Sequence, residues 1–151
     1  MRPNAKVPAQ VQQGLSTDDV VALTSAQVQS LTSAQIGALG TTQIQALETG
    51  DVAVLKTSQV AALGTTQVAA LSTDQIVALT TAQVQQGLGT AQVAALGTAQ
   101  VAALETSDLA ALKTSQIVAL KTSQIAALKT AQVAALTTDQ IVALTTGQVS
   151  N

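Results

Sequence analysis

The chain has 151 residues, which suits one ordinary domain, but it contains no Phe, Tyr, Trp, His or Cys. Charged residues make up 9% of it, against about 25% in a typical protein, and six basic residues leave a net charge of −2. This composition excludes disulfides and thiolate metal sites, gives no electrostatic footprint for nucleic acid or an anionic membrane, and lacks the high charge of a disordered chain.

The N-terminal segment is irregular. Residues 1–8 form a lead-in, and a degenerate repeat unit, PAQVQQG, precedes the first octad. The opening lacks the apolar core of a signal peptide, and no run approaches the roughly 18 apolar residues of a membrane span. The sequence therefore predicts a soluble chain without membrane insertion, in which residues 9–151 form a single repeat domain.

Leucine then recurs every eight residues, from Leu15 to Leu79 and again from Leu88 to Leu144, and so defines seventeen octads. Gly87 is a one-residue insertion that shifts the frame. Counted from its leucine, each octad has Thr (fifteen times) or Ser (twice) at position 3 and Gln or Asp at position 5. Position 6 is Val or Ile except at Leu109, position 8 is mostly Ala, and positions 2, 4 and 7 vary. Self-similarity at a fixed period indicates a repeat architecture.

Three structures can use a period of eight. In one continuous helix, successive leucines would be rotated by about 80°, so no apolar stripe would persist. In a strand, the leucine and the branched residue of position 6 would point to opposite faces, although a β-solenoid with turns inside each octad stays open as the alternative. A short helix in each octad fits best. It predicts an all-α solenoid or superhelix of very short helices, one per eight-residue repeat.

The hydroxyl of position 3 is predicted to be the N-cap of each helix, so that Thr114→Ala should cost about 1 kcal/mol. Where position 2 is also Ser or Thr, as at Thr80, the cap assignment can move one residue earlier. The residues of positions 1, 6 and 8 are expected to face a shared interior, because one octad cannot fold alone. Positions 2, 4 and 7 are expected on the outside.

Charged residues follow the octad as well. All aspartates fall at position 4 or 5, in the predicted first turn, and four lysines fall at position 2, just after a helix end, as the helix dipole favours. Glu48 and Glu105 also occupy position 2 and break this rule. Each stands one octad before a lysine, which predicts an ion pair across adjacent repeats. The aspartates at positions 4 and 5 are Asp18, Asp19, Asp51, Asp74, Asp108 and Asp139. The lysines at position 2 are Lys56, Lys113, Lys121 and Lys129.

Two VQQGL segments, residues 11–15 and 84–88, interrupt the pattern. Gly14 and Gly87 are predicted to be C-caps after a helix one residue longer than the others. The functional alternative makes these segments hinges or docking points.

No catalytic, cofactor-binding or metal-binding residue is predicted. No His can activate the many hydroxyls, and Asp18 and Asp19 suit a helix start better than an acid/base pair or, with Asp51, a metal site. The chain has no glycine-rich phosphate loop and no basic-aromatic patch. We therefore expect a protein that is not an enzyme, with no cofactor, no nucleic-acid partner and no small-molecule ligand. Self-association by end-to-end stacking stays open.

The phrases LTTAQVQ, LSTDQIVAL and LTTDQIVALTTGQV resemble octapeptide arrays in very large bacterial surface or secreted proteins, often labelled as adhesion or haem-utilisation proteins. The resemblance covers residues 9–150. It implies a spacer or stalk, located extracellularly or at the cell surface if the chain is part of such a protein. The haem label does not carry over, because the chain has no His, Cys or Tyr and only Met1 as an axial ligand. The near-uniform repeat suits an engineered scaffold equally well.

The expected function is thus that of a structural repeat module, a spacer, a stalk or a repeat scaffold. The alternative is a binding surface for a protein, a glycan or ice, formed by positions 2, 4 and 7. A β-solenoid would favour ice, because it would turn ranks of threonine outward.

Overall fold

The computed structural model describes residues 14–149, and each octad in that range contains one short helix. No strand occurs between these residues, so the predicted all-α solenoid is confirmed and the β-solenoid alternative is wrong. The helices are α2 (Thr17–Val21), α3 (Ser25–Ser30), α4 (Ser33–Gly37), α5 (Thr41–Ala46), α6 (Thr49–Val54), α7 (Thr57–Ala61), α8 (Thr65–Ala70), α9 (Thr73–Val77), the π-helix η1 (Gln83–Gly87), α10 (Thr90–Ala95), α11 (Thr98–Ala103), α12 (Thr106–Ala111), α13 (Thr114–Ala119), α14 (Thr122–Ala126), α15 (Thr130–Ala135), α16 (Thr138–Ala143) and α17 (Thr146–Val149).

Two consecutive extended residues separate many of these helices. After α3, Leu31 has φ −63° and ψ 139°, although its N–H still bonds to the carbonyl of Val28 at 3.2 Å. The next residue, Thr32, is also extended, with φ −73° and ψ 159°, and it is the N-cap of α4. The leucine of position 1 thus ends one helix while position 2 begins the next, so the chain changes direction once per octad.

The N-cap residue lies at position 2, so its predicted place at position 3 is wrong for these helices. In α9, the Oγ of Ser72 accepts from the N–H of Gln75 at 3.1 Å, whereas Thr73 is the first helical residue and is exposed. Thr114 is likewise the first residue of α13, after Lys113 as N-cap. The N-cap lies at position 2 because the Ser/Thr-x-x-Gln pattern of a capping box begins at that position. Where position 2 is Gly, Glu or Lys, no side chain caps the helix.

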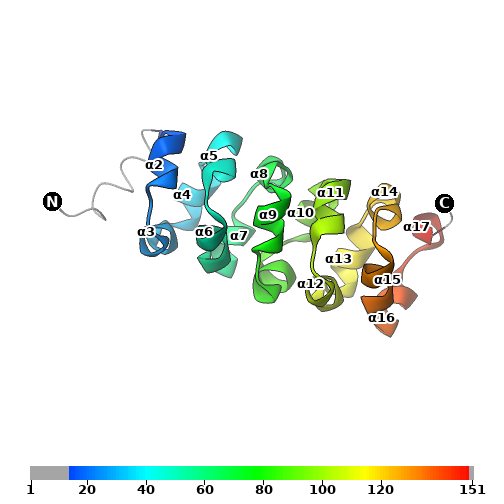
Figure 1. Ribbon diagram of the computed structural model, residues 1–151. Coiled ribbons are helices and arrows are strands. Elements are labelled where there is room, and N and C mark those ends of the chain that lie inside the picture. The colour runs from blue at the N-terminus through cyan, green and yellow to red at the C-terminus, as the bar shows by residue number, and fades with distance from the viewer. Residues whose placement is uncertain (1–13, 150–151) are drawn as a thin grey trace.

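The helices stack into an open rod with α2 and α17 at opposite ends (Figure 1). Each helix packs on the third one after it, as α2 does on α5 and α5 on α8, so three rows of helices follow the rod axis (Figure 1). Side-chain hydrogen bonds join residues 28 and 31 positions apart. One superhelical turn therefore takes between three and four octads.

The interior is narrow and largely aliphatic. Val60 is 0% and Leu63 is 5% exposed, and the same positions 6 and 1 fill the core along the rod as far as Leu120. Position 8 contributes less than predicted, since Ala62 and Ala78 are only partly buried. Position 5, which was not predicted to be internal, is buried instead. Positions 2 and 4 are exposed wherever their side chains are described, and position 7 is exposed or partly buried, so the variable residues lie outside as predicted.

The inserted Gly87 is absorbed by a π-helical turn, in which the N–H of Leu88 bonds to the carbonyl of Gln83 at 3.1 Å. Gly87 does not have the positive φ of an αL C-cap, so that prediction is wrong. A Cβ on Gly87 would lie 2.9 Å from Cβ of Val60, and this close packing against α7 requires glycine. Gly14 has φ +91°, but the helix it was predicted to cap falls outside the described residues.

Charged residues only partly follow the dipole prediction. The aspartates lie in first turns, as expected. The lysines of position 2 are N-caps, as Lys56 is of α7, so each stands at the positive end of the following helix. Glu48 and Glu105, the exceptions to the predicted rule, are also N-caps and occupy the end that favours an acid. No ion pair joins Glu48 to Lys56 or Glu105 to Lys113.

Candidate functional site

The most regular polar feature of the rod is a row of buried glutamines at position 5, which we call the glutamine ladder. In each of these residues, Oε1 accepts from the main-chain N–H of the N-cap residue of its own helix. This bond measures 2.8 Å from Lys56 to Gln59 and 2.6 Å from Gly97 to Gln100. The amide oxygen therefore satisfies a helix-terminal donor whether or not position 2 carries a hydroxyl.

The other end of each ladder side chain reaches back one superhelical turn. Nε2 of Gln59 donates to the carbonyls of Val28 and Leu31, both at 2.8 Å, where α3 ends. The same pair of bonds recurs along the rod, with 2.8–3.2 Å to the position 6 carbonyl and 2.5–2.8 Å to the leucine carbonyl. The residues that make both bonds are Gln59, Gln67, Gln75, Gln83, Gln92, Gln100, Gln116, Gln124, Gln132, Gln140 and Gln148.

Each glutamine thus links the start of one helix to the end of another about 30 residues earlier. One side chain performs both functions only as a neutral amide, because a carboxylate can accept from the N-cap but has no N–H to donate to the carbonyls. These residues are 1–8% exposed. Their hydrogen bonds matter mainly because a buried group without a partner costs roughly 1–3 kcal/mol. The ladder explains why position 5 is so uniform.

Two aspartates interrupt the ladder. Asp51 and Asp108 occupy position 5 of α6 and α12 and are 3% and 1% exposed. Oδ1 of Asp51 accepts from Oγ of Ser25 at 2.8 Å, and Oδ1 of Asp108 accepts from Oγ1 of Thr81 at 2.7 Å. The Oδ2 atoms of both aspartates are buried and have no hydrogen-bond partner.

The two interruptions share a local sequence, ETGD at 48–51 and ETSD at 105–108. These contain the only glutamates of the chain, each the N-cap of a helix that has Asp in the ladder. Burial raises the pKa of Asp108, the hydrogen bond from Thr81 opposes this effect, and the negative charge of Glu105 adds to it. By contrast, hydrogen bonds from Ser16 lower the pKa of the exposed Asp19.

The structure does not bring together the acidic residues weighed as a metal site from the sequence. Asp18 and Asp19 lie exposed at the start of α2, whereas Asp51 is buried in α6, which packs on α3 and α9. No three acidic side chains gather anywhere in residues 14–149. The buried role of position 5 is not among the features predicted from the sequence. The available signal was a glutamine that recurs in fourteen of the seventeen octads and is replaced by Asp in both octads that have Glu at position 2.

No helix in the described part of the chain has the length and hydropathy needed to cross a bilayer.

The fold and the ladder define a class of protein: an all-α solenoid built from octads whose turns are joined by side-chain amides. The sequence matches the ALTTAQ repeat family five times, over residues 13–49, 44–81, 77–106, 101–138 and 125–151, and the chain belongs to that family. The repeat array expected from the resemblance is therefore confirmed. Comparisons with curated proteins and with solved structures gave no match.

Proposed function

We propose that this repeat module is a non-catalytic spacer or stalk, within a surface or secreted protein, whose length is set by its number of octads. The observation that carries the proposal is the glutamine ladder. Along most of the rod the leucine, the branched residue and the glutamine are buried, and the glutamine bonds to the main chain of the other two one turn back. Their uniformity then has a structural cause and needs no substrate or ligand.

The second candidate, a binding face made by positions 2, 4 and 7, is supported by the exposure of those positions. Val77 and Val118 at position 7 are each 44% exposed. Interfaces commonly depend on buried aromatic or Arg anchors, and the octads contain neither. The spacer is therefore the better-supported function.

Small-angle X-ray scattering of a shortened chain tests the spacer. Deleting residues 52–108 removes seven octads together with the insertion and joins Asp51 to Leu109 in register. A spacer should keep its helical circular dichroism while its maximum dimension falls in proportion to the octads removed. A full-length control with Ala91→Ser and Ala99→Ser, both at exposed positions, should keep the original length. If the maximum dimension does not fall with the number of octads, the spacer proposal is wrong.

A further inference from the structure

The two gaps in the ladder each lie opposite a pair of main-chain carbonyls. Gln100 donates to Val68 and Leu71, and Gln116 donates to Val84 and Leu88. Asp108 stands between these two glutamines in the ladder, so the register assigns it the carbonyls of Ile76 and Leu79. The same register, read from the neighbouring Gln59 and its partners Val28 and Leu31, assigns Asp51 the carbonyls of Val20 and Leu23.

Within the described residues no side chain donates to these carbonyls, although the N–H groups of Leu79 and Leu23 bond to the carbonyls of Ile76 and Val20. In the other octads, one Nε2 sits within hydrogen-bond distance of both carbonyl oxygens, so these oxygens converge on one point. An aspartate is one methylene shorter than glutamine and has no N–H. Oδ1 of Asp108 is held by Thr81, two residues beyond Leu79, which directs the carboxylate to the same corner of the rod. Oδ2 is buried there without a partner, so the vacated position is surrounded by acceptors.

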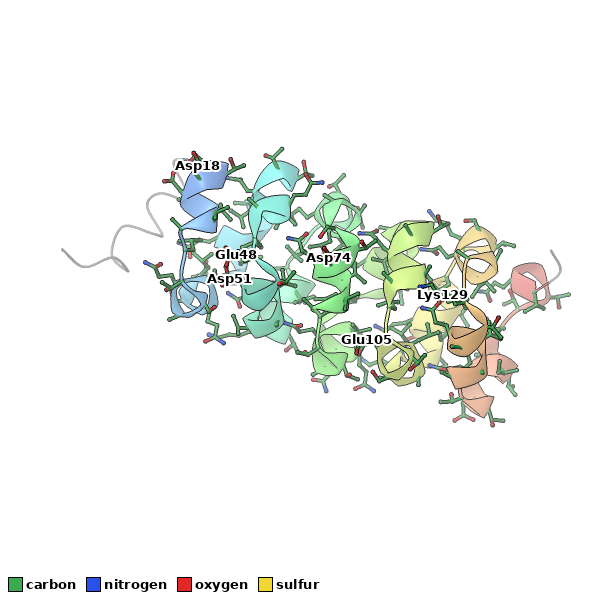
Figure 2. All side chains as sticks on the ribbon, in the orientation of Figure 1. Asp18, Glu48, Asp51, Asp74, Glu105 and Lys129 are labelled. Atoms are coloured by element: carbon green, nitrogen blue, oxygen red, sulfur yellow. The ribbon has the colours of Figure 1, made fainter. Side chains whose placement is uncertain are left out.

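A second carboxylate adjoins each gap. Glu48 and Glu105 precede Asp51 and Asp108 by three residues on the first turn of the same helix, and Figure 2 shows Glu48 beside Asp51. The carboxyl groups of the aspartate and the glutamate and the two main-chain carbonyls form an all-oxygen environment at each gap.

We propose that each gap binds a hard divalent cation, Ca²⁺. Its protein ligands are the aspartate Oδ2, the leucine and position 6 carbonyls one turn back, and the adjacent glutamate. Oxygen donors of this kind, completed by water, are what Ca²⁺ takes in proteins. The cation occupies the place of the glutamine amide nitrogen and joins the two turns as the amide does elsewhere. The two sites lie seven octads apart, so they stabilise separate parts of the rod.

A proton on the aspartate is the competing occupant, because a carboxylic acid could donate to one carbonyl. A proton does not need the neighbouring glutamate, which would only add exposed charge at the helix start. The occurrence of both glutamates of the chain at these two helices favours the cation.

Calorimetric titration of the whole chain with CaCl2 at pH 7 tests the proposal, with thermal melts in EDTA and in CaCl2 beside it. The wild-type chain should bind two ions, Asp51→Gln and Asp108→Gln one each, and the double variant none. Each substitution installs the residue of the other octads, so these variants should fold. At a hundredfold excess over Kd, Ca²⁺ should raise the melting temperature of the wild type by about 5 °C or more. The matched control Asp74→Asn, at an exposed first-turn aspartate, should keep both ions.

The proposal is overturned if CaCl2 up to about 10 mM, above the weakest affinities of extracellular calcium modules, gives neither heat nor a shift of the melt. It is also overturned if binding survives in the double variant. A melting temperature that rises on acidification, with no response to Ca²⁺, would assign the gaps to a proton. None of these outcomes depends on the spacer function, because the scattering measurement needs no cation.

Discussion

Gln59 and Leu31 join two turns of the rod: Nε2 of Gln59 donates to the carbonyl of Leu31 at 2.8 Å, across 28 residues of sequence. The same side chain accepts from its own N-cap at 2.8 Å. Helix capping and turn-to-turn packing are thus performed by one residue type, which couples the formation of each helix to the presence of its neighbour. This coupling explains how helices of four to six residues, unstable alone, persist in the array.

Replacing a ladder glutamine should destabilise the rod far more than replacing a surface glutamine. Gln116→Met keeps the length of the side chain but leaves the N–H of Lys113 and the carbonyls of Val84 and Leu88 without it. We expect a loss of about 3 kcal/mol in the free energy of unfolding, measured by urea denaturation. Gln45→Met, at an exposed position 7, is the control and should stay within about 0.5 kcal/mol of wild type. Equal losses in the two variants would contradict the ladder.

The cap assignment is tested by two adjacent residues of α9. Ser72→Ala removes the hydroxyl that accepts from Gln75 and should cost about 1 kcal/mol. Thr73→Ala, at the exposed first helical residue, should be neutral or slightly stabilising, because alanine is the better helix former. Thr114→Ala should also be neutral or slightly stabilising, whereas an N-cap at position 3 would make it destabilising. Thermal melts rank the stabilities of the variants. If Thr73→Ala lowers the melting temperature more than Ser72→Ala does, the N-cap is at position 3 and our assignment is wrong.

Gly87 should tolerate deletion better than substitution. Gly87→Ala places a Cβ 2.9 Å from Cβ of Val60 and 3.3 Å from the carbonyl oxygen of Thr57, an overpacking expected to cost about 1–3 kcal/mol. Deletion of Gly87 restores an eight-residue unit and should convert η1 into an ordinary α-helical turn.

Gly97→Ala is the matched control for Gly87→Ala, because its Cβ would meet only Oε1 of Gln100 at 3.5 Å. Val60→Ala combined with Gly87→Ala should recover part of the loss by removing the clash. If Gly87→Ala melts at the temperature of Gly97→Ala, the close packing of η1 on α7 is refuted.

In EDTA at pH 7, Asp108→Gln should stabilise the chain by about 1 kcal/mol or more, because it replaces a buried carboxylate oxygen without a partner by the ladder amide. The raised pKa of Asp108 means that the folded state binds the proton more tightly than the unfolded state. Wild-type stability from this group is therefore complete below the usual pKa of 3.8 and falls as pH rises through the folded pKa.

The advantage of Asp108→Gln should accordingly shrink as pH falls from 7 towards about 4. Other charges near α12 are Glu105 on the helix itself, Lys129 at the start of α15, and Asp74 on α9, before the facing carbonyls; η1 has no ionisable side chain. Chemical denaturation across this pH range measures the difference. A constant difference between variant and wild type would contradict a buried, titrating Asp108.

The octad period was sufficient to predict the helices but not their connections. The Leu and Val/Ile spacing predicted one short helix per octad and its buried face, and it placed the variable positions outside. The cap was misplaced by one residue because Ser or Thr often occupies positions 2 and 3 together, as at Ser72 and Thr73. Local chemistry alone makes the two hydroxyls nearly equally suitable as the N-cap.

The role of position 5 depended on contacts that local sequence does not contain. The partners of Gln59 lie 28 and 31 residues away, and which residues meet is decided by how many octads complete a turn. The burial of Asp51 and Asp108, and therefore the gaps in the ladder, also depends on the number of octads per turn. From the sequence, these aspartates are predicted only to favour a helix start.

The sequence by itself determined an all-α array of octad helices with an aliphatic core, because helix formation and amphipathic spacing are properties of eight consecutive residues. Only the tertiary structure decided the open rod, its turn of between three and four octads, the π-helical accommodation of Gly87 and the glutamine ladder. These depend on the angle between successive helices, which the packing of residues about 30 positions apart selects.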